Sequence, residues 1–133
     1  MRYALAALAL VAAGSLLPAR AADLYLFDLL HRPQYRRAYN AMLGTSPSVP
    51  KWIARYSKTG DGPSQPAQDL KVDGDTYLLA DVCKTHDCDD HKLQVIFAPD
   101  GQQAWGRTLE NGSMTWIGYP SPGVRKAVER IGF

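Results

Sequence analysis

Residues 73–112 (DGDTYLLADVCKTHDCDDHKLQVIFAPDGQQAWGRTLENG) decide the fold of this chain. Three Asp-Gly or Asn-Gly dipeptides, at 73–74, 100–101 and 111–112, favour tight hairpins, because both central residues of a type I′ turn need a positive φ. Apolar-rich runs lie between and beside these dipeptides, at 70–72, 76–82, 93–98, 103–109 and 114–119. The pattern predicts five strands in an antiparallel meander.

Helical signals precede the strands. Residues 33–44 begin with a proline, end with a glycine and carry apolar side chains at helical spacing: Tyr35, Ala38, Tyr39 and Met42. Residues 49–56 supply aromatic anchors on a short helix or an extended segment. Residues 57–66 are rich in Gly, Pro and Ser, which predicts a surface loop.

A last helical signal follows the strands. Ser121-Pro122 has the form of a helix cap and a first-turn proline, and the residues after it form one apolar stripe: Val124, Ala127, Val128 and Ile131. Such a stripe buries a helix against a sheet. The sequence therefore predicts an α+β domain with helices packed on one side of a five-stranded antiparallel sheet.

The connection between the second and third predicted strands differs from the other turns. It holds the chain's two cysteines in the segment Cys83-Lys84-Thr85-His86-Asp87-Cys88. A disulfide across so short a ring contributes only about 2 kcal/mol by chain entropy. It also restricts the loop before a partner is met, which improves affinity. The segment is predicted to be a protruding, disulfide-closed binding loop.

The N-terminus has the features of a signal peptide over residues 1–21. A short basic start precedes the apolar run 4–17, and residues 19–21 have the A-x-A form of a cleavage site. The apolar run of about 14 residues is too short to span a bilayer. We expect a mature domain at 22–133, exported to the periplasm, with no membrane anchor after cleavage.

Charge excludes one class of partner. The chain has 15 Lys and Arg against 13 Asp and Glu, and removal of Arg2 and Arg20 with the signal leaves thirteen of each. A nucleic-acid binder normally keeps a basic excess. No nucleic-acid partner is therefore expected.

The sequence gives little support for catalysis. It contains no G-x-S-x-G motif, and its cysteines are spaced C-x4-C instead of the C-x-x-C of redox sites. We expect a protein that is not an enzyme and has no cofactor.

A zinc site is the alternative, because Cys83, His86, Cys88 and His91 are zinc-type ligands. An exported cysteine pair more often oxidises, so no metal is predicted. His31 and His91 receive no role.

The cysteine segment closely resembles the C-K-P-H-D-C loop of the Ivy family, the bacterial inhibitors of vertebrate lysozyme. The resemblance extends to the export signal, the early helix, Pro50-Lys51-Trp52 and the strand that begins at 74–77. It implies a five-stranded antiparallel sheet with helices on one side.

The resemblance also implies a partner and a mechanism. The partner is a host c-type lysozyme or a related muramidase, whose cleft receives the loop. His86 meets the catalytic carboxylates, Asp87 orients its ring, Lys84 sits at the mouth of the cleft, and the Cys83–Cys88 disulfide holds the shape.

One residue departs from the family motif, because Thr85 stands where the family has proline. Proline fixes φ, so Thr85 leaves the loop softer, by up to about 1 kcal/mol. Four carboxylates around the loop suit steering towards a cationic enzyme: Asp81, Asp87, Asp89 and Asp90.

Two functional alternatives and the assembly state remain open. An Ivy-like protein could restrain endogenous lytic transglycosylases, and a small periplasmic zinc protein would use the cysteine and histidine set described above. The sequence does not choose between a monomer and a homodimer.

Overall fold

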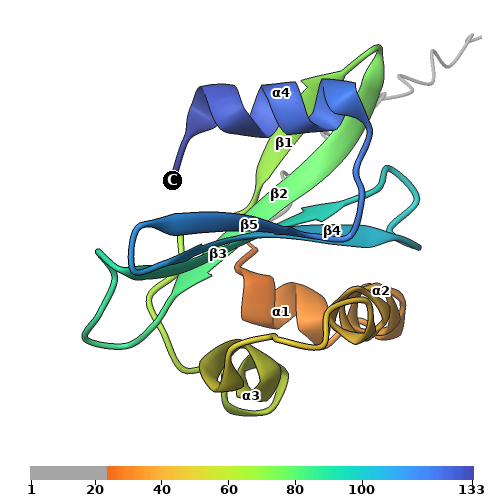
Figure 1. The fold of residues 1–133 in the computed structure, drawn as a ribbon. Coiled ribbons are helices and arrows are strands. Elements are labelled where there is room, and N and C mark those ends of the chain that lie inside the picture. The colour runs from red at the N-terminus through yellow and green to blue at the C-terminus, as the bar shows by residue number, and fades with distance from the viewer. Residues whose placement is uncertain (1–23) are drawn as a thin grey trace, which may run out of the picture.

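The structure is a computed structural model that describes residues 24–133, so the predicted signal peptide lies outside the described residues. Five antiparallel strands form one sheet in chain order (Figure 1). The strands are β1 (Gln68–Val72), β2 (Asp75–Cys83), β3 (His91–Phe97), β4 (Ala104–Glu110) and β5 (Ser113–Ile117). The predicted five-stranded meander and the α+β class are confirmed.

Two of the three predicted hairpin turns are confirmed. Asp73-Gly74 and Asn111-Gly112 have positive φ at both residues, 50° and 84° in the first turn and 50° and 83° in the second. These angles match type I′ turns between directly paired strand ends.

The prediction of a tight turn at Asp100-Gly101 is wrong. Strands β3 and β4 pair from Phe97 to Ala104, and only Gly101 has a positive φ, 70°. The Gly101 N–H donates to the Ala98 carbonyl. Pro99 explains the difference, because its fixed negative φ suits the first central residue of a type I turn and moves the glycine one position later.

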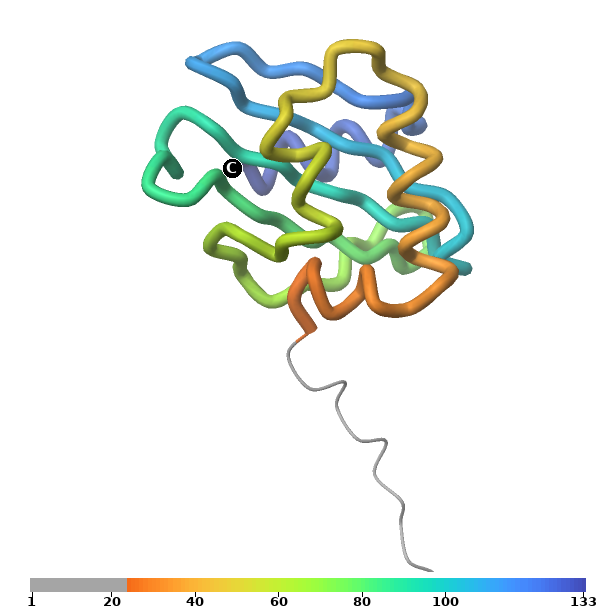
Figure 2. Tube along the Cα trace, turned by 90° about the horizontal axis from the view of Figure 1, so that it is seen from below, coloured from red at the N-terminus to blue at the C-terminus, as the bar shows by residue number. Residues whose placement is uncertain are grey.

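Three helices cover one face of the sheet: α1 (Leu26–Leu30), α2 (Pro33–Gly44) and α3 (Lys51–Thr59) (Figure 2). They share a buried core with alternate residues of the central strands, such as Val82, Leu93 and Val95. Of the two alternatives for residues 49–56, the short helix is confirmed. This helix, α3, continues into the predicted loop as far as Thr59.

The prediction that all helices lie on one side is wrong for α4 (Pro122–Ile131), which packs on the opposite face. There Val124 and Val128 are fully buried with Leu79 and Ile96. The physical reason is visible in β3, where every residue from Leu93 to Phe97 is buried. Successive strand side chains point to opposite faces, so such a strand needs cover on both.

The predicted cap of α4 is confirmed, since the Ser121 hydroxyl accepts a hydrogen bond from the Val124 N–H. Of its predicted stripe, Ile131 is 48% exposed. Within residues 24–133, none of the helices is long and apolar enough to cross a membrane.

Candidate functional site

The cysteine segment forms a closed loop at one end of the sheet. Cys83 is the last residue of β2, and its sulfur is bonded to that of Cys88 with the Cα atoms 4.9 Å apart. The predicted disulfide is confirmed. Because both sulfurs are used in this bond, the alternative zinc set loses its two thiolate ligands. Among residues 24–133, no group of three or more His, Cys, Asp or Glu residues is arranged to hold a metal ion.

The loop tip is a hydrogen-bonded turn that presents His86. The Asp87 N–H donates to the Lys84 carbonyl over 3.0 Å. Of the two central residues only His86 has a positive φ, 64°, which is the signature of a type II turn. Thr85 and His86 are exposed, whereas Lys84 and Asp87 are half-buried. The backbone therefore places the histidine at the outermost part of the loop.

The base of the loop is fixed by backbone hydrogen bonds to the start of β3 and to the turn between β4 and β5. The Lys84 N–H donates to the His91 carbonyl over 3.0 Å, and the His91 N–H donates to the Asp87 carbonyl over 3.1 Å. The Asn111 N–H of the adjacent turn donates to the Asp90 carbonyl over 2.8 Å. The loop thus has a rigid base and an exposed tip.

His91, to which the sequence assigned no role, supports the loop through its side chain. Its Nε2 lies 3.2 Å from the Asp87 carboxylate, and its Nδ1 contacts the Glu110 carboxylate on β4. The side chain is only 13% exposed. Trp52 of α3 donates its indole N–H to the other oxygen of Glu110 over 3.0 Å. A chain of side-chain contacts therefore links the loop to β4 and α3.

A weak sequence signal for this brace existed. His91 opens β3 and Glu110 closes β4, so the antiparallel register pairs them directly. The predicted strands, 93–98 and 103–109, leave both residues just outside the sheet. The sequence also does not show that the Asp87 side chain contacts His91.

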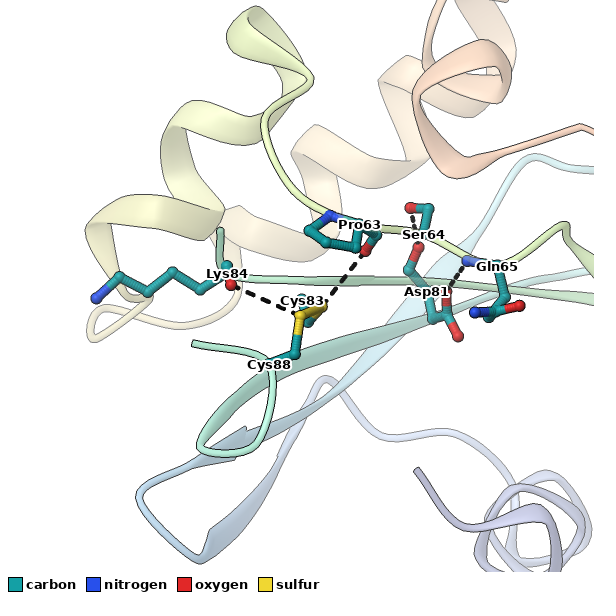
Figure 3. Close-up of a disulfide and its surroundings, with 7 residues drawn as sticks. All are labelled: Pro63, Ser64, Gln65, Asp81, Cys83, Lys84 and Cys88. Carbon is teal, nitrogen blue, oxygen red and sulfur yellow. Dashed lines mark hydrogen bonds between the residues drawn. A yellow bond between two sulfur atoms is a disulfide. The ribbon is translucent and has the colours of Figure 1, made fainter. Parts of the chain in front are cut away.

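A second support runs along the other side of β2 (Figure 3). The Pro63 carbonyl accepts a hydrogen bond from the Cys83 N–H over 2.9 Å. The Ser64 hydroxyl donates to the Asp81 carbonyl over 2.5 Å, and the Gln65 N–H donates to the Asp81 carboxylate over 2.7 Å. We call residues 62–65 the strap.

Gly62 allows the strap to approach the disulfide. Its φ is 132°, and a Cβ atom at this position would lie 2.2 Å from the Cys83 carbonyl oxygen. A side chain would therefore push the strap away from the loop base. The sequence predicts a surface loop over 57–66 and assigns no role to Gly62.

The predicted acidic patch is smaller than the sequence suggests. Asp81 is held by the strap, and burial raises the pKa of its carboxyl, although the Gln65 N–H and Lys92 lower this pKa in part. Asp87 faces His91. Only Asp89 and Asp90 of the four carboxylates are exposed.

The predicted loop residues therefore lie together on one projection. His31 is not part of it: this residue lies at the end of α1, where its Nδ1 is 2.8 Å from the Phe27 carbonyl oxygen. The structure adds His91, Glu110, Trp52 and the strap to the site.

Comparison with known proteins identifies the family of this chain. A model of the family described as "Inhibitor of vertebrate lysozyme (Ivy)" matches residues 34–127. A Pseudomonas aeruginosa protein named "Inhibitor of vertebrate lysozyme" is 34% identical over 115 residues, which cover 76% of this chain and 72% of that protein.

Two uncharacterized relatives are also similar. One from Yersinia pestis is 25% identical over 111 residues, covering 74% of this chain and 70% of its own length. A second Pseudomonas aeruginosa protein is 29% identical over 108 residues, covering 71% and 67%. The family match spans most of the chain, including the whole sheet and the loop. The chain therefore belongs to the Ivy family, whose description is that of an inhibitor and not of an enzyme.

Proposed function

We propose that this protein is a periplasmic inhibitor of a c-type lysozyme or a related muramidase. In this proposal the Cys83–Cys88 loop enters the active-site cleft of the enzyme, with His86 at its tip. The observation that carries the proposal is the exposed His86 at a positive φ on a loop closed by a disulfide. Family membership and the name of the Pseudomonas aeruginosa relative support the choice of partner.

The chemistry of the target explains why a histidine is suitable. A retaining glycosidase such as lysozyme holds two carboxyl groups about 5–5.5 Å apart, and one stays protonated as the general acid. An imidazole between them can donate a charge-assisted hydrogen bond to the ionised carboxylate. It also fills space that the sugar needs, so binding excludes the substrate.

The remaining loop residues act through position. Asp87 faces His91, so its proposed role is to hold the loop and not to orient the His86 ring directly. The disulfide and the Lys84–Asp87 turn reduce the conformational freedom that would be lost on docking. Lys84 remains at the side of the loop, where it can meet the rim of the cleft.

An inhibition assay tests the proposal. Purified mature protein is titrated against a c-type lysozyme, with His86→Ala as the loop variant and His31→Ala as the matched control. Removal of one buried charge-assisted hydrogen bond costs about 1.5–3 kcal/mol, so His86→Ala is expected to weaken inhibition roughly ten- to hundredfold. His31→Ala should leave inhibition unchanged.

Two results would reject the mechanism: equal inhibition by wild type and His86→Ala, or equal losses from both histidine variants. A parallel assay against a periplasmic lytic transglycosylase tests whether an endogenous wall-lytic enzyme is the target instead.

A further inference from the structure

A hollow of about 250 Å³ lies between α3 and the disulfide loop. It is lined by Trp52, Arg55, Thr59, Asp61, Lys84 and Thr85. We call it the α3 hollow. Because Thr85 directly precedes His86, the hollow begins about 3.8 Å along the backbone from the loop tip. A partner that encloses His86 must therefore come close to the hollow.

The charges in the α3 hollow are not balanced. Arg55 and Lys84 face a single carboxylate, Asp61, so the lining carries one excess positive charge. Both ion pairs of residues 24–133 involve His91, so the described residues place no carboxylate within salt-bridge distance of Arg55 or Lys84. Two cations are thus available to an external anion.

The exposed face of α3 extends this positive charge. Lys51, Arg55 and Lys58 are spaced i, i+4 and i+7, so they form one stripe, and all three are exposed. The helix contains no acidic residue. This stripe contrasts with the loop, where Asp89 and Asp90 are exposed.

One wall of the hollow is fixed before any partner binds. The indole N–H of Trp52 is bonded to Glu110, which is also bonded to His91 at the loop base. Both sides of the hollow therefore depend on the same carboxylate. A rigid hollow loses less entropy on binding than a flexible surface.

We infer that the α3 hollow is a second docking point, which takes an aspartate or glutamate side chain from the rim of the cleft that receives the loop. This inference rests on the proposed function. Arg55 provides a planar guanidinium that can bind a carboxylate through two hydrogen bonds, and Lys84 adds a point charge. The exposed acidic groups of the loop and the exposed basic groups of α3 then fix the orientation of the loop in the cleft.

Charge reversal tests the inference. Arg55→Glu is compared with Arg37→Glu, an exposed arginine on α2, which lies farther from the loop than α3 does (Figures 1 and 2). Both variants change the net charge equally and leave the loop intact. Arg55→Glu is expected to lower lysozyme affinity at least tenfold and to reduce its dependence on salt, with an unchanged melting temperature. Arg37→Glu should behave like wild type.

A double-mutant cycle identifies the partner group. Each acidic residue at the rim of the lysozyme cleft is replaced by alanine and measured against wild type and Arg55→Ala. One rim variant should lose affinity with wild type but show little further loss with Arg55→Ala.

The two proposals fail in different ways. If His86→Ala weakens inhibition but Arg55→Glu and Arg37→Glu have equal effects, the second docking point is rejected and the loop mechanism stands. If wild type and His86→Ala are equally inactive, both proposals are rejected.

Discussion

Two connections at the same end of the sheet are built in different ways. The β4–β5 turn is only Asn111-Gly112, and its φ values of 50° and 83° are those of a type I′ turn. The β2–β3 loop spans residues 84–90 and depends on a disulfide, His91 and the strap. The pairing of His91 with Glu110 places the two connections side by side.

The difference suggests that the β4–β5 turn serves the fold, whereas the β2–β3 loop is built to present a binding residue. The short turn follows from two residues and joins two strands, and a backbone hydrogen bond from the Asn111 N–H to the Asp90 carbonyl connects it to the loop. The loop presents an exposed tip, and its shape is supported from both sides by groups distant in the sequence. Changes to the loop supports should therefore alter stability and affinity together, whereas changes to the short turn should alter stability alone.

The largest effect is expected from the strap. Gly62→Ala places a methyl group where a Cβ would be 2.2 Å from the Cys83 carbonyl oxygen, at a φ of 132°. Strain and overpacking should lower the free energy of unfolding by about 2–4 kcal/mol, measured by urea denaturation. Gly44→Ala is the control, because its Cβ would meet nothing within 4 Å. Equal stability of both variants would show that the strap does not support the loop.

Removal of the disulfide should come next. The Cys83→Ser/Cys88→Ser variant should lose about 2 kcal/mol of unfolding free energy and lose lysozyme affinity, because the free loop must be ordered on docking. Thermal melting and titration against lysozyme measure the two effects. A large loss of stability with unchanged lysozyme affinity would contradict the role assigned to the ring.

Loss of the His91 brace should have an intermediate effect. His91→Ala removes contacts with Asp87 and Glu110, which should cost about 1–2 kcal/mol of unfolding free energy and weaken inhibition several-fold. His91→Gln keeps hydrogen-bonding capacity and should restore part of the affinity. If both His91 variants inhibit lysozyme as strongly as the wild type does, His91 does not support the loop.

The short turn provides the matched comparison. Gly112→Ala meets no atom within 4 Å, but its φ of 83° strains an alanine. A loss of about 1 kcal/mol in unfolding free energy is expected, with unchanged lysozyme affinity. A loss of affinity equal to that of His91→Ala would remove the distinction between the two connections.

The smallest effect should be a gain. Thr85 is the first central residue of a turn with the type II signature, where proline is common. Thr85→Pro should tighten inhibition by a few-fold, at most about 1 kcal/mol, with little change in melting temperature. Weaker inhibition would show that the loop needs the Thr85 N–H or a different backbone when bound.

The sequence by itself determined the local features of this protein. The strand runs, the two type I′ turns, the helices that begin with proline and the close cysteine pair depend on residues near one another in the chain. Local conformational preferences are sufficient for such features. The exposed position of His86 also follows from the loop in which it lies.

Only the tertiary structure decided what supports the loop and which faces of the sheet are covered. The contacts of His91 with Glu110 and of Pro63 with Cys83 join residues about 20 apart, and Trp52 reaches Glu110 from α3. Side-chain direction and strand register, which no local pattern contains, determine these contacts. The side of the sheet on which α4 packs was also decided by the tertiary structure. The apolar stripe shows that α4 is buried against the sheet, but only the burial of both faces of β3 shows which face it covers.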